Sequence, residues 1–401
     1  MIDFPYMTQI CKPTASKILF LVVDGLGGLA NPETGLSELE TAKLPNLDKL
    51  SQKSDVGLTT PVAPGITPGS GPGHMALFGY NPIKYLVGRG ILEALGMDID
   101  IGSQDIVARG NLATVDSSGI ILDRRACRMP SEKSAALLKP LSNIKITDTI
   151  IQVFPGKEHR FVVRLRGNGL SDKITETDPQ NIGVPILKAQ SISPDSIKTA
   201  EIVNAFTNTA VEILSSQIKG NAILLRGFSK MPELPSMRSV YNLNPAAIAA
   251  YPMYQGLAKL VGMHVIKTGK CFNDQLDSLE THMNKHDFFF LHYKPTDVSG
   301  EDGIFSAKVD ALEKLDSYIP RLLSMGFETV TIAGDHSTPS IMGKHSWHPV
   351  PFLINSANTK VGVVKSFNER TCLTGSIGHI TATSLITLTL AHAGKLLKFG
   401  P

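Results

Sequence analysis

Three short segments of the chain carry residue types that bind metal ions and transfer phosphate. Asp24 follows an apolar run at residues 18–23, Ser70 lies in a loop rich in glycine and proline, and Asp335 and His336 follow another apolar run. Carboxylates and imidazoles together suit a divalent cation of hard or borderline character. A serine hydroxyl, a weak nucleophile by itself, is activated beside such an ion. The three segments together predict an enzyme that handles phosphate at a metal site.

Each segment also has a simpler structural interpretation when it is taken alone. Asp24 can cap a turn at the end of a strand, and Ser70 can cap a helix that begins near Met75. The adjacent pair Asp335 and His336 is the hardest to explain in this way, because burying such groups without partners costs free energy. The pair therefore favours the metal-site interpretation.

A second set of potential ligands lies close to the first in the sequence. Asp297 follows the apolar run 288–292, and His345 and His348 lie shortly after His336. Two metal ions about 3.5–4 Å apart stabilise both the attacking and the leaving oxygen of an in-line phosphoryl transfer. The two sets of ligands therefore predict two metal ions.

The composition is that of a globular protein with an ample core. The chain has 401 residues, 42% of them hydrophobic and 19% charged, which predicts two domains or one domain with a large insertion. A net charge of +3, with dispersed Lys and Arg, is too small to indicate nucleic-acid binding. Four cysteines without a CxxC pair predict free thiols in a reducing cytoplasm. No segment resembles a targeting or membrane element. We expect a cytoplasmic monomer or small homo-oligomer with a small-molecule substrate and no nucleic-acid or membrane partner.

The candidate ligands require a scaffold that brings them together. Apolar runs at 18–23, 288–292 and 330–333 read as buried strands, each followed by a loop that carries an Asp. Residues 305–323 have helical spacing that Pro320 should break near its end. This alternation predicts an α/β fold with a mostly parallel central sheet flanked by helices, in which ligands collect at the carboxyl ends of the strands.

The middle of the chain has a different pattern. From about residue 105 to 230, short β-like runs separated by Gly- and Asp-rich turns dominate, with one helix near 199–216. We interpret this region as an inserted smaller α+β domain. The expected division is therefore a metal-binding phosphotransfer core at 1–104 and 231–401, and a substrate-binding lid at 105–230.

An anionic phosphorylated substrate needs cations, and Arg is suited to it through paired hydrogen bonds. Arg124, Arg125 and Arg128 follow a short apolar run at residues 120–122. If that strand continues, alternation points Arg124 and Arg128 to one face and Arg125 to the other. A solvated run of charge is the alternative interpretation. Weaker candidates for the same role are Arg226, Lys294 and Arg89.

The chain resembles the archaeal-type cofactor-independent phosphoglycerate mutases of the alkaline phosphatase superfamily, nearly from end to end. The resemblance implies an alkaline-phosphatase-like core that interconverts 3-phosphoglycerate and 2-phosphoglycerate without 2,3-bisphosphoglycerate. It also implies a phosphoserine intermediate and two divalent metal ions, with Mn²⁺ expected and Mg²⁺, Zn²⁺ or Co²⁺ as alternatives. The matching segments are Val22-Val23-Asp24-Gly25, residues 41–48, the Pro-Gly-Ser loop and residues 74–80, Gly88-Arg89-Gly90, Asp123-Arg124-Arg125-Ala126, Thr177-Asp178-Pro179, residues 334–339, His345-Ser346 and residues 393–400.

Carried over to this sequence, the resemblance makes Ser70 the nucleophile. It assigns one metal to Asp24, Ser70, Asp335 and His336, and it assigns Asp297 and His345 to the second.

Three features of the sequence depart from the family pattern. Glu301 stands where the family has a third His ligand, and a carboxylate can serve Mn²⁺ or Mg²⁺ in its place. The segment Gly71-Pro72-Gly73 replaces residues that are usually polar, and His348 replaces one that is usually acidic. Two alternatives stay open: a phosphomonoesterase or mutase for another small phosphorylated metabolite, and a degenerate relative that binds a metabolite without turnover.

Overall fold

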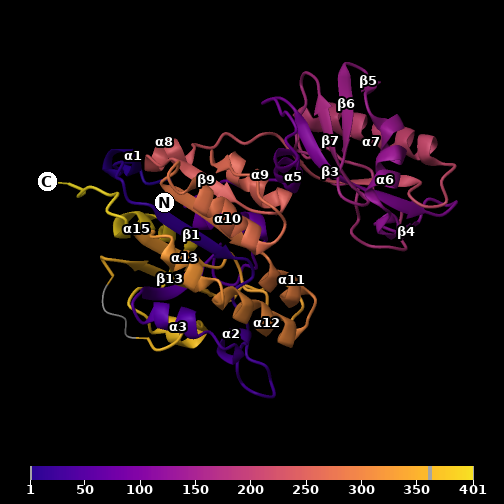
Figure 1. The fold of residues 1–401 in the computed structure, drawn as a ribbon. Helices are drawn as coiled ribbons and strands as arrows, with labels where there is room; N and C mark the ends of the chain where they lie inside the picture. The colour runs from indigo at the N-terminus through magenta and orange to yellow at the C-terminus, as the bar shows by residue number, and fades with distance from the viewer. Residues whose placement is uncertain (1, 360–363, 401) are drawn as a thin grey trace. The chain divides into compact units, whose positions relative to one another are not determined.

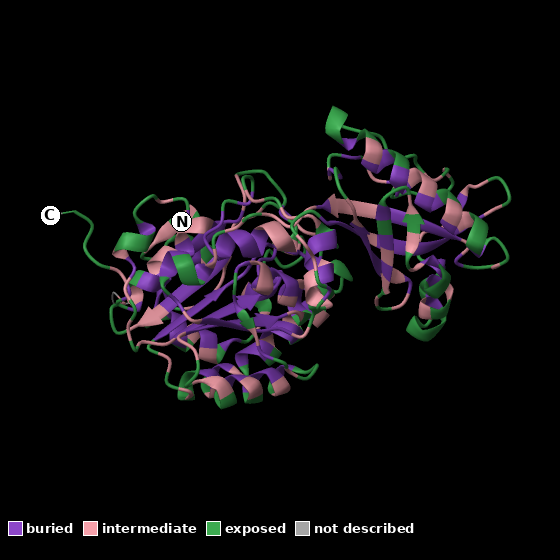
Figure 2. Cartoon of the chain, turned by 90° about the horizontal axis from the view of Figure 1, so that it is seen from above, coloured by how far each residue is buried: buried purple, intermediate pink, exposed green. Residues whose placement is uncertain are grey.

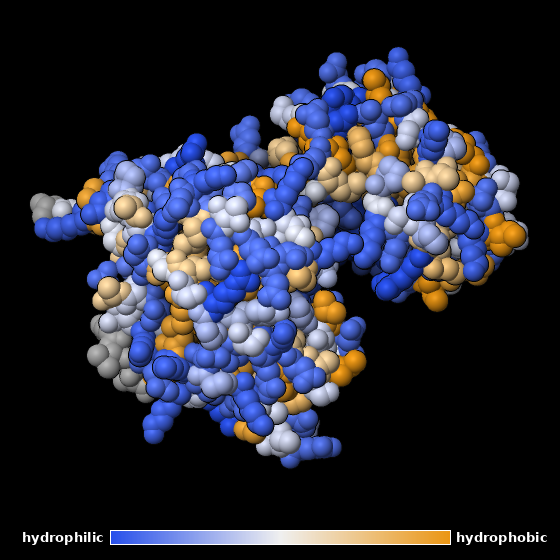
Figure 3. Space-filling view, in the orientation of Figure 1, coloured by the Kyte–Doolittle hydropathy of each residue, from blue (hydrophilic) through white to orange (hydrophobic). Residues whose placement is uncertain are grey.

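The structure is a computed structural model that describes residues 2–359 and 364–400. The chain divides into two compact units, one formed by residues Met1–Leu86 and Leu234–Pro401 and the other by Val87–Glu233. Figure 1 shows the helices and strands of both units. No helix among these described residues is long and apolar enough to cross a bilayer. In the view of Figure 3, apolar side chains are scattered among hydrophilic ones on both units.

An eight-stranded sheet forms the centre of the first unit. Its strands lie in the order β10-β9-β11-β1-β12-β13-β2-β14, and β13 is antiparallel to both of its neighbours. The neighbours in the stretch β10-β9-β11-β1-β12 are all parallel. The strands are β1 Ile18–Val23, β2 Asp55–Thr60, β9 Pro245–Ile248, β10 His264–Val265, β11 Phe288–Tyr293, β12 Thr329–Ala333, β13 Val350–Ser356 and β14 Gly378–Thr381.

The three central strands β1, β11 and β12 are buried at every position. Helices cover both faces of the sheet, so both faces of these strands are buried, as expected for a parallel sheet. Figure 2 shows these buried strands between helices whose outer faces are exposed. The helices of this unit are α1 Met7–Ile10, α2 Glu38–Thr41, α3 Pro45–Ser51, α4 Ser70–Leu77, α8 Met237–Tyr241, α9 Pro252–Leu260, α10 Phe272–His282, α11 Pro295–Glu301, α12 Phe305–Asp316, α13 Ile319–Ser324, α14 Glu369–Leu373 and α15 Leu385–His392.

Three local features refine the expectations from the sequence. The helical stretch around Pro320 is interrupted, because α12 ends at Asp316 and Pro320 lies in the first turn of α13. The helix after the glycine-rich loop begins at Ser70 itself rather than near Met75, with Gly69 as its N-cap. Asp297 lies in the first turn of α11 and not in a loop. The last two predictions were wrong because both helices are short and contain Gly and Pro, so they lack a clear apolar period.

The second unit is built on an antiparallel sheet in the order β4-β3-β7-β6-β5, with β8 paired to β3. Helix α7 Ile197–Leu214 contributes Val203 and Phe206 to a core shared with Phe161 and Leu225. The other elements are β3 Ile106–Val115, β4 Ile121–Asp123, α6 Ser131–Leu138, β5 Ile144–Ile146, β6 Thr149–Pro155, β7 Arg160–Arg166 and β8 Ala222–Ser229.

This unit begins before residue 105, because helix α5 (Arg89–Gly96) packs on β3 and β8. A Cβ placed on Gly90 would come within 2.9 Å of the Ala108 Cα and within 2.8 Å of the Gly227 carbonyl. Glycine at this position therefore permits the close approach of the helix to the sheet.

Candidate active site

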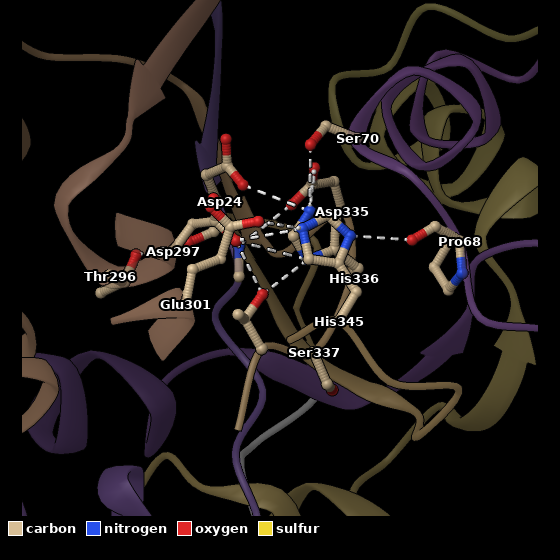
Figure 4. Close-up of polar contacts among 12 residues, drawn as sticks. Asp24, Pro68, Ser70, Thr296, Asp297, Glu301, Asp335, His336, Ser337 and His345 are labelled. Carbon is tan, nitrogen blue, oxygen red and sulfur yellow. Dashed lines mark hydrogen bonds and ion pairs between the residues drawn. The ribbon is translucent and has the colours of Figure 1, made fainter. Parts of the chain in front are cut away.

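The candidate ligands of the first unit meet at the carboxyl ends of three adjacent strands. Asp24 directly follows β1, Asp297 follows β11, and Asp335 and His336 follow β12. Because β1 pairs in parallel with both β11 and β12, these strand ends lie at one edge of the sheet. Figure 4 shows that side chains far apart in the sequence point toward the ring of His336.

The first group of side chains converges on the Nε2 atom of His336. Nε2 lies 3.2 Å from the Ser70 Oγ, 3.3 Å from the Asp24 Oδ1 and 3.2 Å from the Asp335 Oδ2. Asp24, Asp335 and His336 are fully buried. His74 lies beside this group, with its Nδ1 3.0 Å from the Asp335 Oδ2 and hydrogen bonded to the Ser70 carbonyl.

The tautomer of His336 follows from its contact with Thr338. The Thr338 hydroxyl donates to the Asp297 Oδ1 at 2.8 Å, so its oxygen accepts from the His336 Nδ1 at 2.9 Å. With the proton on Nδ1, the lone pair of Nε2 faces the Asp24 Oδ1 and the Asp335 Oδ2. A second hydrogen bond of this kind fixes the orientation of many metal-binding histidines.

Two carboxylate oxygens in the first group accept no hydrogen bond. The Asp24 Oδ1 and the Asp335 Oδ2 are both buried without a hydrogen bond, although the His74 Nδ1 lies 3.0 Å from the Asp335 Oδ2. A buried anionic oxygen without a donor is costly, and a cation between these oxygens and the His336 Nε2 would remove that cost. The residues of the first group therefore fit a divalent metal ion.

The second group gathers around the Nε2 atom of His345. This atom lies 3.4 Å from the Asp297 Oδ1 and 3.5 Å from the Glu301 Oε1. The His345 Nδ1 donates to the Pro68 carbonyl at 2.9 Å, so Nε2 is the atom that faces the carboxylates. Asp297 is buried, whereas the Glu301 side chain is 57% exposed. Asp297, His345 and the adjacent ring of His336 also meet the spacing required for a metal ion.

The ionisation of these groups matches the needs of ligands. Burial opposes the charge on Asp24, but the hydrogen bond from His292 and the charge of Lys294 outweigh it and hold the pKa of Asp24 well below its ordinary value. Burial likewise opposes ionisation of Asp297, whose hydrogen bond with His345 lowers its pKa to about 2. Both carboxylates are therefore ionised at neutral pH.

The two imidazoles differ in charge. Burial lowers the pKa of His336 despite the nearby Asp335 and Asp24, so this ring is neutral. For His345, burial also acts to lower the pKa, but its hydrogen bonds with Asp297 and Glu301 outweigh burial and raise the pKa to about 10. Without a metal ion, a proton on the His345 Nε2 therefore occupies the position between the carboxylates.

Ser70 is held at the first position of α4. Its side chain does not cap the helix, which leaves the hydroxyl directed at His336. A Cβ on Gly73 would lie 2.3 Å from the Asp335 carbonyl oxygen, so glycine there lets α4 approach the loop that carries Asp335. This close packing accounts for the absence of a polar side chain at Gly73.

Four residues of the site were not singled out from the sequence. The Tyr254 hydroxyl and the His292 Nε2 both donate to the Asp24 Oδ2, the latter at 3.0 Å. Thr296 donates to the Asp24 carbonyl at 2.5 Å, and Thr338 links His336 to Asp297. A histidine that ends the apolar run of β11 was a usable signal for His292, whereas Tyr254 lies in α9 and offers none.

Lys294 lies between the two groups rather than apart from them. Its Nζ is 2.9 Å from the Asp24 Oδ2 and 2.5 Å from the Asp297 Oδ2. The ammonium also donates to the Tyr254 hydroxyl at 2.9 Å. The side chain that we expected to contact substrate is therefore in contact with both candidate ligand carboxylates.

A second lysine, Lys308 of α12, is fully buried beneath the site. Its Nζ donates to the carbonyls of Gly27 and Thr338, each at 2.8 Å. Burial lowers the pKa of Lys308, and the nearby Glu38 and Glu369 oppose this effect. Lys308 thus ties the loop after β1 to the loop after β12.

The arginines predicted to bind substrate all lie in the second unit. Strand β4 ends at Asp123, and residues Ala126, Cys127 and Arg128 have positive φ angles, so the strand does not continue as the predicted alternation required. Arg124 makes a paired contact with Asp178 at 3.0 and 2.7 Å. Arg125 and Arg128 are exposed.

His348, another position departing from the family pattern, contacts Ser346 and is in neither ligand group.

Arg226 belongs to a concentration of positive charge on this unit. It lies directly opposite Arg109 across the β3–β8 pair, and like charges in that position destabilise a sheet. Burial lowers the pKa of Arg109 to about 10, and the charges of Arg89, Arg160 and Arg226 add to this effect. The Nε atoms of Arg109 and Arg160 are buried without a hydrogen-bond acceptor. Glu93 lies 3.4 Å from the Arg109 Nε, and Glu176 and Asp178 lie within 4.0 Å of Arg226, so the acidic residues neutralise this arginine cluster only in part.

Comparisons with known proteins agree with the geometry of the site. Residues 51–218 match the model of the 2,3-bisphosphoglycerate-independent phosphoglycerate mutase family. A Thermosipho africanus protein named as a probable mutase of this kind is 50% identical over 98% of both chains, and one from Thermus thermophilus is 46% identical over 99% of both.

Two solved structures share the fold. A protein of Pyrococcus horikoshii matches 96% of this chain and 99% of its own with a TM-score of 0.84 and 26% identity. The cofactor-independent phosphoglycerate mutase of Thermoplasma acidophilum matches 94% of this chain and 100% of its own with a TM-score of 0.72 and 29% identity. The chain belongs to the 2,3-bisphosphoglycerate-independent phosphoglycerate mutase family.

Proposed function

We propose that the protein interconverts 3-phosphoglycerate and 2-phosphoglycerate through a phosphoserine at Ser70. One observation supports this most directly: the Ser70 hydroxyl lies at the start of a helix, 3.2 Å from the His336 Nε2, and this nitrogen faces one oxygen each of Asp24 and Asp335 that accepts no hydrogen bond. Full-length relatives at about half identity carry the name of this enzyme. Nothing in the site favours a phosphomonoesterase or a protein without turnover.

Two divalent cations, with Mn²⁺ expected, would supply Lewis-acid stabilisation of the reacting oxygens. The residues proposed to hold them are Asp24, Ser70, Asp335 and His336 for one, and Asp297, Glu301 and His345 for the other. Glu301 is included because its carboxylate and that of Asp297 face the same atom of His345.

The proposed reaction exchanges one phosphate ester for another. The Ser70 Oγ forms a bond to phosphorus, the bond from phosphorus to the glycerate oxygen breaks, and that oxygen takes up the proton that Ser70 loses. The reverse step, on the other hydroxyl of the same glycerate, gives the isomer. The backbone N–H groups of Ser70 and Gly71 at the start of α4 suit the phosphoryl oxygens, whereas Pro72 has no N–H to offer.

The anionic groups of the substrate are assigned to the second unit. We propose that Arg226 and Arg124, with Arg125 and Arg128 at the exposed turn, bind the carboxylate or phosphate. The arginine cluster around Arg109 supports this assignment because it concentrates positive charge and because the Nε atoms of Arg109 and Arg160 have no hydrogen-bond acceptor.

The test is an enolase-coupled assay of the Mn²⁺-loaded protein without 2,3-bisphosphoglycerate. The proposal expects 2-phosphoglycerate to form from 3-phosphoglycerate with almost no inorganic phosphate released. Release of phosphate at the rate of substrate loss would show a phosphomonoesterase instead. The matched pair of variants is Ser70→Ala, which should lose activity, and the control Ser299→Ala, which should retain activity. The Ser299 hydroxyl donates to the Pro295 carbonyl.

A further inference from the structure

The hydrogen bonds around Asp24 are distributed unequally between its two carboxylate oxygens. Oδ2 receives three donors: the Tyr254 hydroxyl, the His292 Nε2 at 3.0 Å and the Lys294 Nζ at 2.9 Å. Oδ1 receives none, although it is buried. A carboxylate in water accepts at both oxygens, so this asymmetry is a property of the surrounding residues.

We propose that Tyr254, His292 and Lys294 act as positioning residues that hold Asp24 as a one-oxygen ligand, with Oδ1 reserved for a metal ion. The inference rests on the metal site of the proposed function and assigns a new role to three residues around it. We refer to the three residues as the Asp24 clamp.

The clamp is rigid because its members also contact one another. The Tyr254 ring stacks on the His292 ring with centroids 3.7 Å apart, and His74 packs against both rings at 4.9 and 5.4 Å. The Lys294 ammonium donates to the Tyr254 oxygen, which in turn donates to Asp24. A chain of hydrogen bonds of this kind polarises each member and strengthens the last one.

The protonation of the clamp residues matches their role as donors. Burial and the charge of Asp24 raise the pKa of Tyr254 well above its ordinary value, so its hydroxyl keeps the proton that it donates. Burial lowers the pKa of His292 in spite of Asp24, so the ring is neutral and its single ring proton serves Oδ2. Both residues can therefore be replaced without changing the net charge of the site.

The experiment measures Mn²⁺ binding to the metal-free protein by calorimetry, with Asp24→Asn identifying which of the two binding steps involves this group. Outer partners of metal ligands typically contribute about 10–100-fold to affinity. We expect Tyr254→Phe to weaken the Asp24 step by about tenfold and to leave the other step unchanged. The control is Tyr293→Phe, because the buried Tyr293 hydroxyl donates to the Ala311 carbonyl at 2.8 Å and not to a carboxylate. It should leave both steps unchanged.

A second pair of variants separates the donor from the shape of the side chain. His292→Gln retains an N–H that can reach Oδ2 and should bind Mn²⁺ nearly as the wild type does, whereas His292→Leu should weaken the Asp24 step. The clamp would be refuted if Tyr254→Phe and His292→Leu bound Mn²⁺ with wild-type affinity, or if they weakened both Mn²⁺ binding steps equally. Because Mn²⁺ binding is measured without substrate, it tests the clamp independently of the mutase activity. Refuting the clamp would not refute the mutase activity, and a protein that binds Mn²⁺ but lacks mutase activity would not refute the clamp.

Discussion

Metal binding to the second ligand group should release a proton from His345. The pKa of this residue is raised to about 10 by Asp297 and Glu301, so its Nε2 is protonated at neutral pH. A metal ion binds only the neutral ring, and it must displace that proton. Raising the pH toward 10 therefore strengthens binding of the metal ion, and lowering the pH weakens it.

The magnitude follows from the competition between the metal ion and the proton. Below the pKa of His345, each pH unit changes the fraction of neutral ring about tenfold, so the affinity of this step should rise about 100-fold from pH 6.5 to pH 8.5. His336 behaves differently, because burial lowers its pKa and its ring is already neutral. The binding step at Asp24 and Asp335 should change little over the same range.

The assay is calorimetric titration of the metal-free protein with Mn²⁺ in buffers of different ionisation enthalpy. One proton should be released in the His345 step and almost none in the other. His345→Gln should abolish the proton-linked step, and His348→Gln should preserve it, since His348 faces Ser346 and not a carboxylate. If both steps kept the same affinity within about twofold from pH 6.5 to pH 8.5, the protonated state of His345 would be refuted.

Three further substitutions test other parts of the site. Ser70→Ala should reduce kcat by at least about 10³-fold while the Mn²⁺ content measured by metal analysis stays near wild type; retained activity would exclude Ser70 as the nucleophile. Glu301→Gln should weaken only the His345 binding step, by about tenfold, and an unchanged isotherm would show that the exposed carboxylate is no ligand. Lys308→Met should lower the free energy of unfolding by about 2–4 kcal/mol in denaturant titrations, because the buried carbonyls of Gly27 and Thr338 each lose the hydrogen bond from its ammonium. Lys314→Met, on the exposed side of the same helix, should change it by less than about 0.5 kcal/mol, and equal effects would remove the special role of Lys308.

The scaffold of the site could be predicted because its strands carry a strong local signal. Strand β1 is a continuous apolar run, β11 and β12 are rich in apolar residues, and each of the three is followed by a candidate ligand. These features predict buried strands and the edge of the sheet at which the ligands lie. The break near Pro320 follows from the geometry of proline. These features depend only on neighbouring residues.

The partners of the ligands could not be predicted, because they come from distant parts of the chain. Tyr254 and Asp24 are 230 positions apart, and nothing near Tyr254 indicates that its hydroxyl points at a carboxylate. The start of α4 at Ser70 was missed for a related reason. Its helical conformation depends on packing against the loop of Asp335, which residues 70–73 alone do not reveal.

The hydrogen bond from His345 to Pro68 joins the second ligand group to the backbone two residues before the nucleophile. The Nε2 atom of the ring faces the carboxylates, and the Nδ1 atom donates to this backbone carbonyl. The imidazole ring is planar and cannot bend between its two nitrogens. A shift of the ring on binding of a metal ion to the second group would therefore act on the residues that precede Ser70. A cation held by the second ligand group can in this way influence the position of the Ser70 hydroxyl.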